Sequence, residues 1–129
     1  MSERYRDLAS LGITRIENEL LVRDFLEVLS MRDAAALDPF LHPDVRFNGS
    51  STSQAAGKAA VLHVCEQLFA NFPVYEVQAV AMSSVGRVVL VEEAVRVSID
   101  ASCNAHWLIG FASFEVVGYQ IVSWRQLHG

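Results

Sequence analysis

Residues 88–97 read VVLVEEAVRV, a β-strand pattern with two adjacent glutamates at its centre. Neighbouring side chains of a strand point to opposite faces of the sheet, so Glu92 and Glu93 belong to different faces. The face of Glu93 is otherwise aliphatic, and its other members are Val89, Val91, Val95, Val97 and Ile99. The opposite face mixes Glu92 with Arg96 and Ser98. The pattern therefore predicts that Glu93 points into an apolar interior, while Glu92 lies on a partly wet surface or an interface.

A buried carboxylate must be paired, hydrogen-bonded or protonated, because burial disfavours the charged form and raises the pKa. Two interpretations of Glu93 are open at this point. In the structural one, Glu93 pairs with a cross-strand Arg or His, or a local bulge lifts it into water. In the functional one, Glu93 is an acid or a base at the wall of a pocket.

Further strand patterns lie on both sides of this stretch. Three segments are rich in β-branched and aromatic residues, and they are residues 74–84, 104–116 and 119–127. Short turns that include Gly86 and Gly118 separate the strands, so consecutive strands should pair antiparallel. In the last segment, alternation places Trp124 and Gln126 on the same face.

The N-terminal half of the chain has helical patterns instead. Thr14-x-x-Glu17 is a capping box, which predicts that a long helix begins there and leaves residues 1–12 as a flexible segment or a short extra helix. The apolar positions of this helix recur at helical spacing, and they are Ile16, Leu20, Phe25, Val28 and Leu29. The spacing predicts an amphipathic helix that lies on another layer of the protein.

Two more helices are predicted before the strands. A short helix capped by Asp33 leads into an extended stretch at residues 45–47, and a full helix covers residues 58–71. The apolar face of the second consists of Val61, Val64, Cys65, Leu68 and Phe69. Helices that precede the strands must cover one face of the sheet. The predicted fold class is therefore α+β, with three helices packed on a curved antiparallel sheet in one domain of residues 1–129.

The composition excludes several classes of protein. A hydrophobic fraction of 52% with 19% charged residues is typical of a globular chain, and no apolar run approaches the roughly 20 residues of a membrane helix. The net charge of -5, with scattered basic residues, argues against a nucleic-acid partner. The N-terminus lacks a signal pattern, so a cytoplasmic location is expected. Cys65 and Cys103 form neither a CxxC pair nor a zinc cluster, so packed thiols and no metal or cofactor are expected.

The order of these elements resembles a known superfamily. The segment LVRDFLEVLSMRDAAALDPFLHPDVRF, residues 21–47, is similar to the helix, short helix and strand of nuclear transport factor 2-like (SnoaL-like) proteins. The likeness covers nearly the whole chain from about Thr14. It implies a cone-shaped α+β barrel, a scaffold that hosts isomerases, dehydratases, cyclases, epoxide hydrolases and pure binding modules.

Within that superfamily, two segments most resemble the limonene-1,2-epoxide hydrolase group. They are VLVEEAV at residues 89–95 and FEVVGYQIVSWRQ at residues 114–126. That group activates water with an Asp–Arg–Asp set, whose Arg falls on Glu93 and whose two Asp positions fall on Val95 and Gln126. The triad is therefore absent, because neither Val95 nor Gln126 can act as a carboxylate base.

The steroid isomerase branch of the superfamily is no better match. Its tyrosine, its catalytic aspartate and its protonated aspartate fall near Phe25, Phe47 and Ala112. The oxyanion hole and the base of that branch are therefore both absent from this chain.

The resemblance and the valine alternation agree that Glu93 faces a cavity. The expected lining of this apolar pocket is Phe25, Phe47, Asn48, Val91, Val95, Leu108 and Trp124, with Glu93, Gln126 and His106 as the candidate catalytic groups. One hypothesis is a cofactor-free hydrolase, isomerase or dehydratase that uses Glu93 as acid or base on a small hydrophobic substrate. The alternative is a non-catalytic ligand-binding or dimeric assembly domain. The superfamily implies a homodimer through the exposed sheet face, here Leu90, Glu92, Ala94, Trp107, Ile109 and Phe111.

Overall fold

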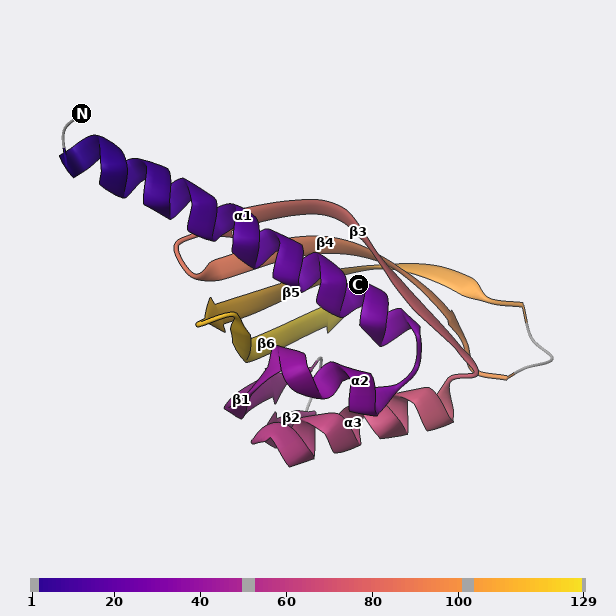
Figure 1. The fold of residues 1–129 in the computed structure, drawn as a ribbon. Coiled ribbons are helices and arrows are strands. Elements are labelled where there is room, and N and C mark those ends of the chain that lie inside the picture. The colour runs from indigo at the N-terminus through magenta and orange to yellow at the C-terminus, as the bar shows by residue number, and fades with distance from the viewer. Residues whose placement is uncertain (1–2, 50–52, 101–103, 129) are drawn as a thin grey trace.

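The structure is a computed structural model that describes residues 3–49, 53–100 and 104–128 (Figure 1). Its elements, in chain order, are α1 (Glu3–Ser30), α2 (Ala34–Leu37), the 3₁₀ turn η1 (Asp38–Phe40), β1 (Leu41–Asn48), β2 (Gln54–Ala56), α3 (Lys58–Asn71), β3 (Val74–Val85), β4 (Val88–Ser98), β5 (His106–Val117) and β6 (Gln120–His128). The predicted α+β class, with helices against a curled sheet, is confirmed.

The six strands form one sheet in the order β2-β1-β6-β5-β4-β3. The last four strands pair antiparallel, as expected for consecutive hairpins. The sheet predicted as antiparallel is mixed, because β1 runs parallel to β6 and places Phe47 beside Trp124. A parallel pair needs a long crossover between its strands, and here α3 and four strands supply it. The sheet curls without closing, since β2 and β3 remain at its two edges.

Helix α1 is longer than the sequence predicts. It begins at Glu3 instead of Thr14 and passes through Gly12 without a break. A single glycine in a helix costs only about 1 kcal/mol, which the flanking helix-forming residues can offset. Ile16 and Leu20, predicted on the buried face, are more than half exposed, because the face of α1 that meets the sheet carries Asn18, Val22 and Phe25 instead. No helix in the described part of the chain is long and apolar enough to cross a membrane.

The turn after α1 fixes the position of α3. Asp33 caps α2 as predicted, since its side chain accepts a hydrogen bond from the Ala35 N–H. Arg32 donates hydrogen bonds to the carbonyl oxygens of Phe69 and Phe72 at the end of α3. Charged donors on these last carbonyls satisfy groups that the helix itself leaves unpaired. The end of α3 from which the chain enters β3 is therefore held to the turn after α1.

The core contains an aromatic cluster centred on Trp124. Its indole lies edge-on to Phe25 and Phe47, with ring centroids 5.2 and 4.7 Å apart, and is stacked at 6.0 Å on Phe114. Such pairs add about 0.5–1.5 kcal/mol beyond the area that they bury. The cluster joins α1, β1, β5 and β6, so the orientation of Trp124 is determined by all of them.

The alternation of β4 follows the prediction over most of its length. Glu93 has no exposed surface, like the valines around it, while Leu90 on the other face is 46% exposed. The prediction is wrong at the end of the strand, where Ile99 is exposed and Ser98 is buried instead. Strand β4 ends at Ser98, whose hydroxyl donates to the Asp100 carbonyl oxygen, so the alternation does not extend to Ile99.

Candidate functional site

Glu93 lies in a part of the sheet where its neighbours are small. Its partner on β5 is Gly110, and its partner on β3 is Ala79, next to an irregularity in the pairing between Ala79 and Ala81. On β5, Ala112 follows Gly110 on the same face. Side chains from β4 and β6 must cross β5 to meet, a span of about 10 Å for two strand spacings. The glycine and the alanine leave room for long side chains to do so.

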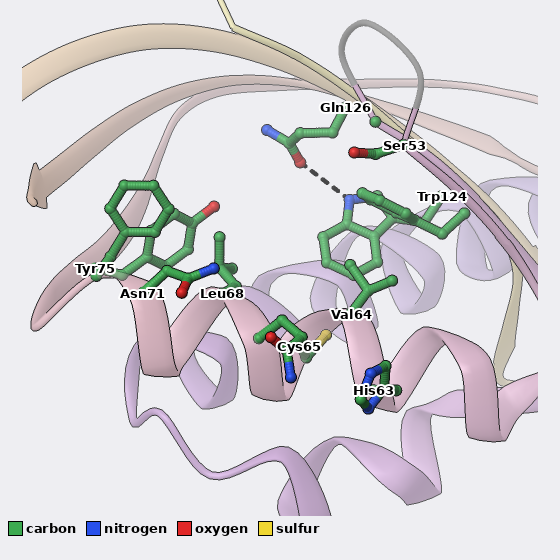
Figure 2. A pocket seen from close by; sticks show the side chains of 13 residues that line it. Ser53, His63, Val64, Cys65, Leu68, Asn71, Tyr75, Trp124 and Gln126 are labelled. Atoms are coloured by element: carbon green, nitrogen blue, oxygen red, sulfur yellow. Dashed lines mark hydrogen bonds between the residues drawn. The ribbon is translucent and has the colours of Figure 1, made fainter.

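Gln126 of β6 crosses this space and binds Glu93. Its Nε2 donates to Glu93 Oε2 at 2.5 Å, and its Oε1 accepts from the indole Nε1 of Trp124 at 3.0 Å (Figure 2). Neither Gln126 nor Trp124 is more than 5% exposed. The three side chains form a continuous hydrogen-bonded chain in the protein interior. The structural alternative of a cross-strand Arg or His partner is wrong, because the partner of Glu93 is an amide.

The Glu93 carboxyl group is only partly satisfied. Its Oε1 atom is buried and has no hydrogen-bond partner among the residues that the structure describes. Burial raises the pKa of Glu93, and the hydrogen bond from Gln126 opposes this only in part. A buried polar atom without a partner costs about 1–3 kcal/mol. Such an atom is uncommon in folded proteins and often marks a functional group.

A cavity of about 400 Å³ lies between α3 and the sheet. Its lining is mainly apolar and consists of Phe47, Gly49, Ser53, His63, Val64, Cys65, Gln67, Leu68, Asn71, Phe72, Tyr75, Trp124 and Gln126. The exposed residues His63, Gln67 and Asn71 recur every four positions on α3 and mark the mouth of the cavity. Gln126 lies at its sheet side (Figure 2). The amide of Gln126 is therefore the link between the cavity and the buried Glu93.

Two buried titratable groups of the cavity wall, Cys65 and Tyr75, favour their neutral forms. Burial raises the pKa of the Cys65 thiol to about 12, with a smaller contribution from Glu66. Burial also raises the pKa of Tyr75, and a negative charge on Glu93 or Cys65 would raise it further. Because a raised pKa of a thiol or phenol means that the anion is disfavoured, both groups keep their protons at neutral pH.

The structure places the predicted site residues in three groups. Phe47, Trp124 and Gln126 line the cavity, and Glu93 lies directly behind Gln126. Phe25, Val91 and Val95 were expected to line it, but they are packed in the core and do not. The remaining predicted residues lie elsewhere: His106 and Leu108 are exposed on β5, and Asn48 borders a separate groove with Leu90 and Phe111.

Sequence reasoning missed several polar groups of the cavity wall, and the two buried ones are Tyr75 and Cys65. Tyr75 occupies the buried face of β3 together with Val77, and Cys65 occupies the buried face of α3. Both patterns are visible in the sequence as apolar stripes, but nothing in them tells which members face a cavity. In the described ranges, no three His, Cys, Asp or Glu side chains gather as metal ligands.

Comparison with known proteins identifies the family. The SnoaL-like domain family matches residues 22–124, so this chain belongs to that family. Among curated proteins, no relative of the chain was found.

Solved structures share the fold at low sequence identity. An epoxide hydrolase of the limonene-epoxide-hydrolase-like type from M. tuberculosis has a TM-score of 0.77 at 21% identity, over 89% of this chain and 84% of that one. An NTF2-like protein from Burkholderia pseudomallei has a TM-score of 0.78 at 16% identity, over 88% and 91%. A protein of ketosteroid isomerase-like fold from Catenulispora acidiphila has a TM-score of 0.76 at 13% identity, over 82% of both. The predicted resemblance to the nuclear transport factor 2-like superfamily is thus confirmed.

Proposed function

We propose that this chain binds a small, mainly apolar molecule in the cavity between α3 and the sheet, with Gln126 as the polar anchor. The observation that carries the proposal is the hydrogen-bonded chain from Trp124 through Gln126 to Glu93 at the wall of that cavity. Ligand pockets of proteins combine an apolar lining with a few fixed polar groups. A cavity of about 400 Å³ lies within the usual size range of such pockets.

Rigid support is what distinguishes Gln126 from an ordinary core amide. Its amide oxygen accepts a hydrogen bond from the Trp124 indole, which three phenylalanines hold in place. Its amide nitrogen donates a hydrogen bond to Glu93. An anchor whose orientation is already set loses little freedom when a ligand binds. The other polar groups of the lining, among them Asn71 and Ser53, lie around the same space (Figure 2).

The test is a binding screen with a variant that fills the cavity. Small ring ketones, epoxides and hydrocarbons, for example cyclohexyl methyl ketone, are titrated by calorimetry. Leu68→Trp, which enlarges a side chain of the lining, should abolish binding. Ala70→Trp adds the same ring on the exposed side of α3 and should leave binding intact. Equal binding by both variants would place the ligand outside this cavity and refute the proposal.

Turnover by Glu93 is a second candidate function, and the unpartnered Oε1 atom of this carboxyl group favours it. An acid of raised pKa that is linked to an apolar cavity suits the protonation of a leaving or carbonyl oxygen. The reaction would be an epoxide opening, an isomerisation or a dehydration, without the Asp–Arg–Asp set of the epoxide hydrolases. Glu93→Gln should then abolish turnover while the fold is kept. Full activity of that variant would remove this candidate.

The outer face of the sheet supports a further proposal, a homodimer. Leu90, Trp107, Ile109 and Phe111 of β4 and β5 are 46–59% exposed and lie close together in the register of these strands. A large exposed apolar patch usually marks an interaction site, and a second copy of the chain is the occupant that the superfamily resemblance favours. Light scattering should give twice the monomer mass for the native chain and the monomer mass for Phe111→Glu. A native monomer at micromolar concentration would contradict the dimer.

A further inference from the structure

The hydrogen-bonded chain around Glu93 has a fixed direction. An indole N–H can only donate, so the Gln126 atom that faces Trp124 must be the amide oxygen. The amide nitrogen of Gln126 therefore faces Glu93 and donates to Oε2. Oε2 is thus an acceptor, and a proton on Glu93 is favoured on Oε1, because the carbonyl oxygen of an acid accepts hydrogen bonds more strongly than its hydroxyl oxygen. Oε1 is the buried atom without a partner among the described residues.

Among the described residues, the hydrogen bond from Gln126 is the one contact found that would stabilise the ionised form of Glu93. Its strand neighbours are Ala79 and Gly110, and no Lys, Arg or His in the described part of the chain forms an ion pair with it. The titratable groups of the cavity wall near it are Tyr75 of β3 and Cys65 of α3, and both would be anionic if ionised. A fully buried carboxylate with one accepted hydrogen bond is strongly disfavoured.

We propose that Glu93 is a neutral carboxylic acid in the folded protein, with its proton on Oε1, and that it makes this end of the cavity select uncharged ligands that carry a hydrogen-bond acceptor. The inference rests on the proposed binding function, and it identifies the chemical class of the ligand. It also assigns Glu93 the role of a donor, whereas a general base would need the ionised form.

Tyr75 can pass the hydrogen-bond donor role of Glu93 on to the cavity. Its hydroxyl belongs to the lining and points into the cavity towards Gln126 (Figure 2). If the Tyr75 oxygen accepts the Oε1 proton of Glu93, its own proton is left to be donated to a ligand. If a ligand oxygen reaches Oε1 instead, it again meets a donor. In both arrangements the ligand meets a hydrogen-bond donor, so a ketone, ester or epoxide oxygen can bind there. A carboxylate or an ammonium ion would lose its hydration without gaining a partner of opposite charge.

The protonation state is tested first, on the ligand-free protein. With glutamate labelled at Cδ by ¹³C, the Cδ resonance of Glu93 is followed between pH 4 and 9 and assigned through its contacts to the Gln126 side-chain amide. We expect Glu93 to keep the shift of a protonated acid at pH 7, while Glu92 on the outer face shows that of a carboxylate. An ionised Glu93 at pH 7 would overturn the proposal. The assignment needs no variant, so the test does not depend on whether Glu93→Gln folds.

The ligand class is tested second, with three molecules of similar shape. Cyclohexyl methyl ketone, cyclohexanecarboxylate and cyclohexylmethylamine are titrated at pH 7 against the native chain and Glu93→Gln. The ketone should bind at least about tenfold more tightly than the two ions, and Glu93→Gln should keep this preference, because its amide is neutral and still donates. Equal or tighter binding of the carboxylate would overturn the ligand class. If none of the three binds while Glu93 is protonated, the binding function fails and the protonation assignment stands.

Discussion

The Trp124 indole and the Gln126 amide oxygen are joined by a 3.0 Å hydrogen bond, and this bond fixes the direction of the polar contacts around Glu93. Because Trp124 is held by Phe25, Phe47 and Phe114, the aromatic core sets the geometry of the candidate site. Substitutions in the aromatic cluster should therefore also change the hydrogen bonds of Gln126 and Glu93.

Replacing Trp124 by Phe should destabilise the protein. The variant loses the indole donor, leaves Gln126 Oε1 buried without that partner, and opens space beside Phe47. We expect the free energy of unfolding to fall by about 2–4 kcal/mol, measured by urea denaturation. Trp107→Phe, on the outer face where Trp107 is 59% exposed, is the matched control; with both variants made in the monomeric Phe111→Glu background, it should change stability by less than about 0.5 kcal/mol. Similar losses of stability in the two variants would show that the buried Trp124–Gln126 hydrogen bond contributes little to stability.

The stability of the native chain should fall as pH rises. The pKa of Glu93 is raised by folding, so the folded state keeps a proton that the unfolded state loses above the ordinary glutamate pKa. The free energy of unfolding therefore decreases from about pH 4.3 upwards, until the pH exceeds the raised pKa. Glu93→Gln should remove this part of the pH dependence, and Glu92→Gln should not. The measurement is urea denaturation at a series of pH values, and identical slopes for all three proteins would contradict the buried acid.

Gln126 and Glu93 can meet only if the side chains on the inner face of β5 between them are small. Gly110→Val places a branched side chain at the position paired with Glu93. We expect a loss of about 1–3 kcal/mol of stability from overpacking, together with a shift of the Gln126 side-chain amide resonances. Ser113→Val introduces the same side chain on the other face of β5, and it should be neutral or stabilising. A harmless Gly110→Val would mean that the two side chains do not meet over Gly110.

Cys65 should resist alkylation in the native protein. A thiol pKa of about 12 leaves very little thiolate at pH 8, and the thiolate is the nucleophile. In a Cys103→Ser background, iodoacetamide should react with Cys65 at least about a hundredfold more slowly than in urea. A bound ligand should slow the reaction further, because Cys65 belongs to the cavity lining. Rapid labelling of the native protein would contradict the buried, protonated thiol.

Local patterns predicted much of the fold correctly. Alternation in β4 placed Glu93 inside, Asp33 marked the start of α2, and helical spacing predicted α3 over residues 58–71. These features depend on neighbouring residues alone, which a single sequence contains. The capping pattern at Thr14 failed because the helix-forming residues before it extend α1 through Gly12. A cap is a preference of about 1 kcal/mol, and it does not end a helix that the residues on both sides favour.

The lining of the cavity could not be predicted in the same way. Whether an inward residue faces the cavity or the core depends on where α3 crosses the sheet, which alternation does not contain. Val95 and Tyr75 both point inward, yet only Tyr75 belongs to the lining. The parallel pairing of β1 with β6 is likewise a long-range contact. Gly110 and Ala112 were a usable signal, since small residues between Glu93 and Gln126 allow them to meet.

The central claim is that a ligand binds beside Gln126, and the two indole N–H resonances test it most directly. In a ¹H–¹⁵N correlation spectrum, Trp124 reports on the cavity and Trp107 on the outer face of the sheet. On saturation with cyclohexyl methyl ketone, we predict that the Trp124 resonance shifts and that the Trp107 resonance does not. A shift of Trp107 alone, or no shift of either under conditions where calorimetry shows binding, would contradict the account.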